Sequence, residues 1–249
     1  MFKGFYNLTS GMLSQGRRLD VVASNMTNVS TAGYKVDRYT DSTFRDEVIS
    51  RVGNQDKSGA QQLGSQSYIL APSQLYTDYT QGGLEETGLS LDFAIEGEGF
   101  FAVSQGGQVA YTRAGSFSLD EEGYLCLPGQ GRVLNREGNP LHLGTDKIEA
   151  DKTGALYNDN GYYLGSLGIY SFPDNGALER NDQGLFVGGG AQLTQDCVIH
   201  NQTVERSNVN MVQEMVSMMT TQRALQSAAQ MSKIYDQVMT KATGELGRL

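Results

Sequence analysis

Both ends of the chain carry an apolar repeat with steps of three and four residues, and no proline interrupts either repeat. The N-terminal repeat passes through Phe5, Leu8, Met12, Gln15, Leu19, Val22, Met26 and Val29. The C-terminal repeat passes through Val212, Met215, Met219, Gln222, Leu225, Ala229, Ser232, Tyr235 and Met239. Because this spacing keeps the repeated side chains on one side of a helix, it predicts two long terminal helices that pair through these seams as a coiled coil.

Local signals mark where these helices begin and end. The first helix is expected to end before the small polar cluster 30–32, which Gly33 closes in a left-handed conformation. Asn210, followed three residues later by Gln213, predicts the start of the second helix, and Gly244 predicts its end. Residues 1–35 and 202–249 are therefore assigned to the two terminal helical segments.

Between the helices the apolar period changes to two, in short runs such as 93–96, 100–103 and 109–112. Glycine-containing turn signals separate these runs at close intervals, as in 120–123, 136–139 and 159–161. This pattern predicts an antiparallel β domain over residues 91–201. Residues 36–90, which are polar with scattered tyrosine and glycine, are expected to form an extended connector. The predicted fold class is α+β.

The predicted helices are too long to hide their apolar surface against each other. Helices of this length extend to about 40 and 50 Å. A pair joined through a compact β domain cannot cover Phe5, Tyr6, Leu13 and the row of methionines all together. We therefore expect neighbouring subunits to cover the remainder, with methionine giving an adaptable interface. Repeating that contact head to tail produces a helical polymer of this chain.

Charge and composition exclude several classes of partner. The formal charge is −9 and the pI is near 4.7, which argues against nucleic acid and anionic membranes as partners. Residues 1–35 and 206–249 carry net charges of +3 and +2, so the excess of acid lies between them. No apolar run has the length of a cleaved signal peptide or of a membrane span. Cys126 and Cys197 lack metal-ligand spacing and are expected to be free thiols.

Three blocks of sequence resemble the flagellar hook and basal-body rod family. The first is Ser24-Asn-Met-Thr-Asn-Val-Ser-Thr-Ala-Gly-Tyr-Lys35, which is similar to that family's N-terminal signature. The second comprises residues 81–103 and 111–120, and the third is Ser207-Asn-Val-Asn-Met-Val-Gln-Glu-Met215 with Gln222-Arg-Ala224. The resemblance is closest to the distal rod branch. Ala32, Met26 and Thr27 depart from the usual residues, which leaves a proximal or accessory rod subunit open.

The resemblance implies a structural subunit that links the basal body to the hook and transmits torque for motility. It implies export in an unfolded state by the flagellar type III apparatus, without a cleaved signal, and assembly with itself and with other rod and hook subunits. The paired helices would form the inner layer of a tube and the β domain an outer layer. Besides the seams, the expected assembly residues are those of the turn after the first helix: Asn25, Asn28, Thr31 and Gly33.

Some of these residues also permit other interpretations. The four turn residues could serve only local capping, and Tyr34 and Lys35 have no evident partner in the sequence. Glu96 with Glu98, or the acidic run 120–122, could be offered as the carboxylates of a cell-wall hydrolase, although their close spacing in turns favours solvated surface. His142 and His200 lack further ligands at metal spacing. Besides a structural subunit and a hydrolase, an adhesin-like binding module is a third possible class of function. We expect no enzyme activity and no cofactor.

Overall fold

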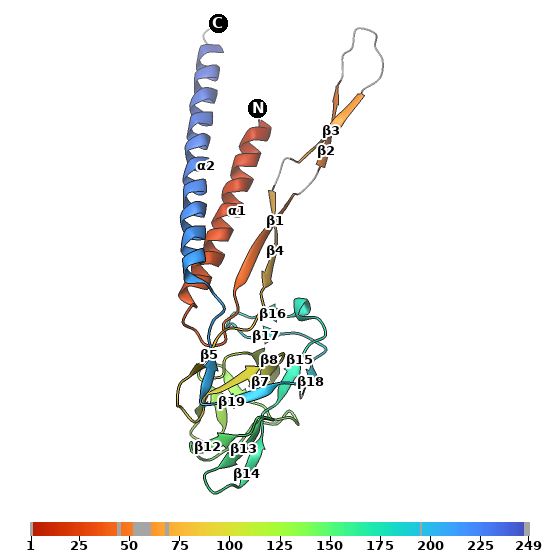
Figure 1. Ribbon diagram of the computed structural model, residues 1–249. Helices are drawn as coiled ribbons and strands as arrows, with labels where there is room; N and C mark the ends of the chain where they lie inside the picture. The colour runs from red at the N-terminus through yellow and green to blue at the C-terminus, as the bar shows by residue number, and fades with distance from the viewer. Residues whose placement is uncertain (1, 44–45, 52–60, 68–69, 195, 247–249) are drawn as a thin grey trace. The chain divides into compact units, whose positions relative to one another are not determined.

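The computed structural model describes residues 2–43, 46–51, 61–67, 70–194 and 196–246. The chain divides into two compact units (Figure 1). Unit 1 contains residues 1–27, 37–76 and 210–249, and unit 2 contains residues 28–36 and 77–209. The chain therefore passes between the units four times, after residues 27, 36, 76 and 209.

Unit 1 contains the two terminal helices, α1 (Phe2–Thr27) and α2 (Met211–Leu246), which pack together as predicted. Helix α1 ends before Ser30, as expected. Asn210 caps α2, because its side-chain oxygen accepts the backbone N–H groups of Val212 at 3.1 Å and Gln213 at 3.3 Å. Helix α2 ends at Leu246, two residues beyond the predicted stop at Gly244. A single glycine near a helix end lowers helix stability without forcing the helix to stop.

Over the first half of α2, the side that is shielded from solvent within this chain differs from the predicted seam. The side of α2 that is shielded from solvent passes through Met211, Glu214, Met218, Thr221, Leu225, Ala228, Ser232, Tyr235, Met239 and Ala242. These positions alternate strictly in steps of three and four, as a continuous heptad requires. The predicted seam took two successive steps of three at Gln222, which shifts a heptad out of register. From Leu225 onward the two assignments share Leu225, Ser232, Tyr235 and Met239.

The rest of unit 1 is made of strands in the segment predicted as an extended connector. Strand β1 (Asp37–Thr43) pairs with β4 (Leu70–Thr77), and β2 (Asp46–Arg51) pairs with β3 (Gln61–Ser67). Helix α1 packs on β1. Arg18 binds Asp41 at 2.9 Å across this contact, and Ser14 donates a hydrogen bond to the same carboxylate. The segment predicted as a connector thus contains two pairs of strands. The sequence pattern did not reveal them.

Unit 2 is the antiparallel β domain, and its strands are short. The largest sheet has the order β16 (Glu179–Arg180), β17 (Phe186–Val187), β8 (Gln108–Thr112), β7 (Phe100–Gln105), β11 (Gly131–Val133), β10 (Leu125–Leu127) and β9 (Ser118–Leu119). Strand β15 (Ile169–Ser171) pairs with β7 and with β18 (Gln192–Leu193). A second sheet joins β12 (Ile148–Ala150), β13 (Ala155–Asn158) and β14 (Tyr163–Ser166).

Two further pairs connect the C-terminal end of unit 2 to its start. Strand β19 (Val198–Asn201) pairs with β6 (Phe93–Glu96), and β20 (Thr203–Glu205) pairs with β5 (Leu84–Glu86). One 3-10 turn, η1 (Asn175–Ala177), completes the elements named here. Residues 202–209, which were assigned to the C-terminal helix, belong instead to the β domain.

Strand β7 lies between two apolar cores, which explains its continuous apolar run. Phe101 and Val103 pack in a large core with residues of β6, β10, β13 and β19. Phe100 and Ala102 face the other way, into a smaller aromatic core with Tyr111. Successive side chains of a strand point to opposite faces, so both faces of β7 are buried.

Four loops of unit 2 share one five-residue turn. In each, the side chain of the first residue accepts backbone N–H groups from the third and fifth residues, and the fourth residue is a glycine with φ between 76° and 83°. The loops are 120–124, 135–139, 158–162 and 181–185. Aspartate or asparagine is needed for the side-chain bonds, and glycine for the left-handed backbone. The predicted turn signals at three of these loops are confirmed.

Candidate functional site

Residues 33–36, which follow α1 in the chain, are bound into unit 2 along their whole length. The Gly33 N–H donates to the Glu205 carbonyl at 2.7 Å, and the Tyr34 carbonyl accepts the Asn208 N–H at 3.4 Å. Gly33 has φ of 69°, and a Cβ there would lie 2.2 Å from the backbone of Arg113 and Ala114. Both the backbone conformation and the close approach therefore require glycine at this position.

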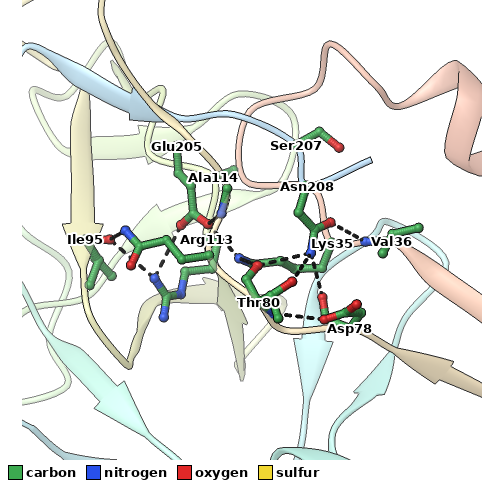
Figure 2. Close-up of polar contacts among 12 residues, drawn as sticks. Lys35, Val36, Asp78, Thr80, Ile95, Arg113, Ala114, Glu205, Ser207 and Asn208 are labelled. Carbon is green, nitrogen blue, oxygen red and sulfur yellow. Dashed lines mark hydrogen bonds and ion pairs between the residues drawn. The ribbon is translucent and has the colours of Figure 1, made fainter. Parts of the chain in front are cut away.

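Lys35 carries the most deeply buried charge of this segment (Figure 2). Its Nζ donates to Glu205 Oε1 at 2.6 Å and to the Thr80 carbonyl at 2.8 Å. The side chains of Lys35 and Glu205 are each only 1 % exposed. Burial of an ion pair is tolerated only when further hydrogen bonds satisfy the two charges. Here those bonds come from three different stretches of chain.

Glu205 is the shared acceptor of this group. Its Oε1 also accepts the Gly82 N–H at 2.8 Å, and its Oε2 accepts a hydrogen bond from Arg113 Nη1 at 3.3 Å. Arg113 in turn donates to the carbonyls of Ile95 and Gly97. One carboxylate thus faces two buried cations. We call Lys35, Thr80, Arg113, Glu205 and Asn208 the root cluster.

Asn208 uses both ends of its amide within the root cluster. Its Oδ1 accepts the Val36 N–H at 2.8 Å, and its Nδ2 donates to the carbonyls of Asp78 at 2.9 Å and Thr80 at 3.0 Å. The Asp78 N–H closes the arrangement by donating to the Val36 carbonyl at 2.9 Å. A single side chain therefore connects residues 34–36, 78–80 and 206–208, as Figure 2 shows.

Desolvation dominates the electrostatics of the root cluster. It lowers the pKa of Lys35 from its ordinary value, although the charge of Glu205 and its hydrogen bond act in the opposite direction. The pKa of Arg113 is lowered for the same reason, again against the effect of Glu205. Glu205 is the largest influence that opposes desolvation at both cations, and the more weakly acting charges of Asp78 and Glu98 favour charged Lys35 and charged Arg113, respectively.

The turn residues singled out in the sequence lie on both sides of the boundary between the units. Asn25 is buried in unit 1, where its amide binds both the N–H and the carbonyl of Asp37. In unit 2, Thr31 donates to Asn28 Oδ1 at 3.2 Å. Tyr34, which was left without a predicted partner, has the Arg180 guanidinium 4.6 Å from its ring centre. Asn25 therefore supports β1, whereas Asn28, Thr31 and Gly33 shape the turn.

The predicted seam residues fall into two groups. The first group is at least partly shielded from solvent and comprises Leu8, Met12, Leu19, Val22 and Met26 of α1 and Leu225, Tyr235 and Met239 of α2. Phe5 of α1 is exposed. Val212, Met215 and Met219 are 71, 42 and 54 % exposed, and Val216 beside them is 55 % exposed. Met231, Ile234 and Val238 form a second exposed apolar group further along α2. Unit 1 thus leaves apolar side chains of α2 uncovered by its own chain.

Sequence reasoning missed Lys35, Arg113, Glu205 and Asn208 as members of one site. A signal was present for three of them, since Lys35, Arg113 and Asn208 lie within the blocks that carry the family resemblance. The sequence does not show that these residues meet in one cluster, because their positions are far apart in the chain. The acid that joins them, Glu205, lies outside those blocks.

Three of the five acidic residues considered for hydrolysis, Glu96, Asp120 and Glu122, bind a neighbouring side chain. Glu96 binds His200 at 2.6 Å across the β6–β19 pair. Asp120 and Glu122 both bind Arg132, each at 2.7 Å. Cys126 and Cys197 are free thiols, as expected. Within the described part of the chain, no helix combines the length and apolar character that crossing a membrane requires.

Known families match the chain in three places. Residues 5–35 match the family described as the flagella basal body rod protein, and residues 94–214 match the flagellar hook protein FlgE/F/G D1 domain. Residues 200–245 match the flagellar basal body rod FlgEFG protein C-terminal family. The first match ends at Lys35, and the last two span Glu205 and Asn208.

Individual relatives extend over nearly the whole chain. The flagellar basal-body rod protein FlgF of Mesorhizobium japonicum is 32 % identical, over 92 % of this chain and 91 % of its own length. The flagellar basal-body rod protein FlgG of Bacillus subtilis is 28 % identical, over 96 % of this chain and 97 % of its own. The flagellar hook protein FlgE of Treponema pallidum is 32 % identical over 53 % of this chain.

Proposed function

Because the chain belongs to the family of flagellar hook and basal-body rod proteins, we propose that it is a structural subunit of the bacterial flagellar rod, located in the basal body. The observation that carries this proposal is the likeness to rod proteins over more than nine tenths of the chain, including both terminal helices. In this role the protein polymerises with copies of itself, links the basal body to the hook and transmits torque.

The exposed apolar side chains of α2 support polymerisation through the terminal helices. An apolar side chain on an isolated helix surface gains stability when a neighbour removes it from water. Val212, Met215 and Met219 are therefore proposed as contacts to other subunits rather than to α1. The seam residues that pack within the chain, such as Leu19 and Leu225, then act by keeping the helix pair together.

Within the rod we propose a distal position, with other rod and hook subunits as neighbours. A proximal or accessory position is the alternative, and the relatives include proteins named FlgG and FlgF. We further propose that the protein has no enzymatic activity and that the flagellar export apparatus delivers it unfolded. The partners found for Glu96, Asp120 and Glu122 support a structural role for these carboxylates.

Electron microscopy of basal bodies from a strain deleted for this gene tests the proposal. We expect rods that stop before the hook, and complete rods when the gene is restored. The length of the remaining rod separates a distal from a proximal position, because loss of a proximal subunit leaves less of the rod behind. Complete flagella and normal swimming in the deletion strain would refute the proposal and favour a surface binding module.

A further inference from the structure

The three stretches of chain joined by the root cluster share a topological property. Residues 34–36 continue into β1, residues 78–80 follow β4, and residues 206–209 continue into α2. Each lies in unit 2, next to a point where the chain crosses into or out of unit 1. We call these three stretches the exit segments.

Hydrogen bonds of the Asn208 and Lys35 side chains hold the exit segments together. The Asn208 side chain binds the first exit segment through Val36 and the second through Asp78 and Thr80, while belonging itself to the third. The Lys35–Glu205 pair ties the first exit segment to the residue that directly precedes the third, and Lys35 also binds Thr80 of the second. All three are thereby held at one spacing inside unit 2.

We propose that Asn208 is a positioning residue, which fixes the three exit segments relative to one another so that every copy presents them alike. The proposal rests on the rod function proposed above. A closed or helical assembly repeats one contact, so each copy must present its elements with the same geometry. Asn208 is suited to this because its short, planar amide satisfies a donor and two acceptors on two different segments at once.

A positioning role and a purely structural role of Asn208 predict different effects when this residue is replaced. If Asn208 only adds stability, replacing it has the same effect on swimming as an equally destabilising change elsewhere in unit 2. If it sets the spacing of the exit segments, its replacement abolishes swimming even when unit 2 stays folded. Ile148→Val provides the comparison, since Ile148 is buried in the large core and is not part of the root cluster. Asn201→Ala is a second control, because Asn201 is not part of the root cluster; its side chain donates to the Ile148 carbonyl at 3.4 Å and accepts the neighbouring Gln202 N–H at 2.9 Å.

The spacing itself can be measured by electron paramagnetic resonance. Cys126 and Cys197 are first replaced by serine, and spin labels are attached to cysteines introduced at Ser30 and Arg206, both of which are exposed and lie in unit 2. We expect one narrow distance distribution in the otherwise unaltered protein and in Asn201→Ala. In Asn208→Ala we expect the distribution to broaden, while the melting transition stays close to that of Ile148→Val.

Swimming of cells that carry each variant gives the second readout. We expect loss of swimming with Asn208→Ala and retention with Asn201→Ala and Ile148→Val. A narrow distribution in Asn208→Ala, or swimming like that of Ile148→Val, overturns the proposal. If Asn208→Ala does not fold, Asn208→Asp keeps an acceptor for the Val36 N–H but loses both donors, and the same criteria apply. Complete rods in the deletion strain would refute the rod function itself, whereas truncated rods with a swimming Asn208→Ala strain refute only the positioning role.

Discussion

Replacing Glu205 by glutamine tests whether one carboxylate holds the root cluster together. Glutamine keeps the size and shape of the side chain but removes the negative charge. Lys35 and Arg113, whose side chains are 1 and 6 % exposed, would then remain buried without the carboxylate that both of them bind. Glutamine also has only one oxygen, whereas Glu205 accepts from Lys35, Gly82 and Arg113 through two.

The expected loss follows from this geometry. Removing one partner of a buried, hydrogen-bonded ion pair costs about 3–5 kcal/mol, because the other charge is left uncompensated. For a chain of this size, each kcal/mol lowers the melting temperature by roughly 2–4 °C. We therefore expect Glu205→Gln to lower the melting temperature of unit 2 by roughly 6–20 °C. The free energy of unfolding should fall by the corresponding amount.

Urea unfolding followed by circular dichroism measures the free energy, and hydrogen exchange with mass spectrometry assigns the loss to residues 28–36 and 77–209. Glu85→Gln is the matched control, since Glu85 and Arg206 form an exposed pair at 3.4 Å. Such a surface pair contributes at most about 1 kcal/mol. The double variant Glu205→Met with Lys35→Met should recover part of the loss, because it removes one uncompensated cation together with its partner.

The reasoning fails if Glu205→Gln unfolds within about 1 kcal/mol of the original protein, the range of a surface pair. It also fails if the double variant is less stable than Glu205→Gln alone. The first result would mean that solvent reaches the cluster. The second would mean that the hydrogen bonds of Lys35 to Thr80 and Glu205 outweigh the cost of its buried charge.

Three further predictions concern other parts of the molecule. Met219→Asp should leave the isolated protein as stable as before, because Met219 is 54 % exposed, but should stop assembly and swimming; Leu225→Asp should also destabilise the helix pair, and Gln226→Asp, an exposed polar position, should do neither. Thermal melts and a soft-agar swimming assay separate the three, and normal swimming with Met219→Asp would contradict the proposed contact. Gly161→Ala should cost about 1–2 kcal/mol, because φ is 76° with no atom within 4 Å, whereas Gly189→Ala, also in open space but without a left-handed backbone, should be neutral; equal effects on urea unfolding would refute the strain argument. Because burial lowers the pKa of Lys35 from 10.5, the folded protein binds fewer protons than the unfolded chain between that lowered pKa and 10.5, so this group makes the free energy of unfolding rise with pH across that window; the rise should be absent in Lys35→Met, and parallel pH profiles of the two proteins would contradict it.

The helices and the fold class could be predicted from the sequence because their signals are local. The steps of three and four residues, the Asn210 cap and the glycine turns each depend on neighbours within a few positions. The register of α2 needed more, since Val212, Met215 and Met219 are as apolar as a seam requires. Only the strict alternation of the heptad through Glu214 and Thr221 distinguishes the side that packs on α1.

The root cluster could not be predicted in the same way. Its connections join Lys35 to Glu205, Arg113 to Glu205 and Asn208 to Thr80, and no periodic pattern relates these positions. A buried lysine also runs against the usual preference of that residue for the surface. Likewise, the polar segment 36–90 gives little sign of its strands, because paired strands with exposed faces need no alternation of apolar residues.

The separation of 170 residues between Lys35 and Glu205 imposes an order on folding. The four five-residue turns can form as soon as their own residues are available. The Lys35–Glu205 pair closes a very long loop, so it cannot form until both residues are present together and free to fold. A chain that emerges one end first therefore acquires its hairpins early and its root cluster late. Until Glu205 is in place, Lys35 and Arg113 lack the carboxylate that allows them to be buried, and the β domain cannot complete its fold.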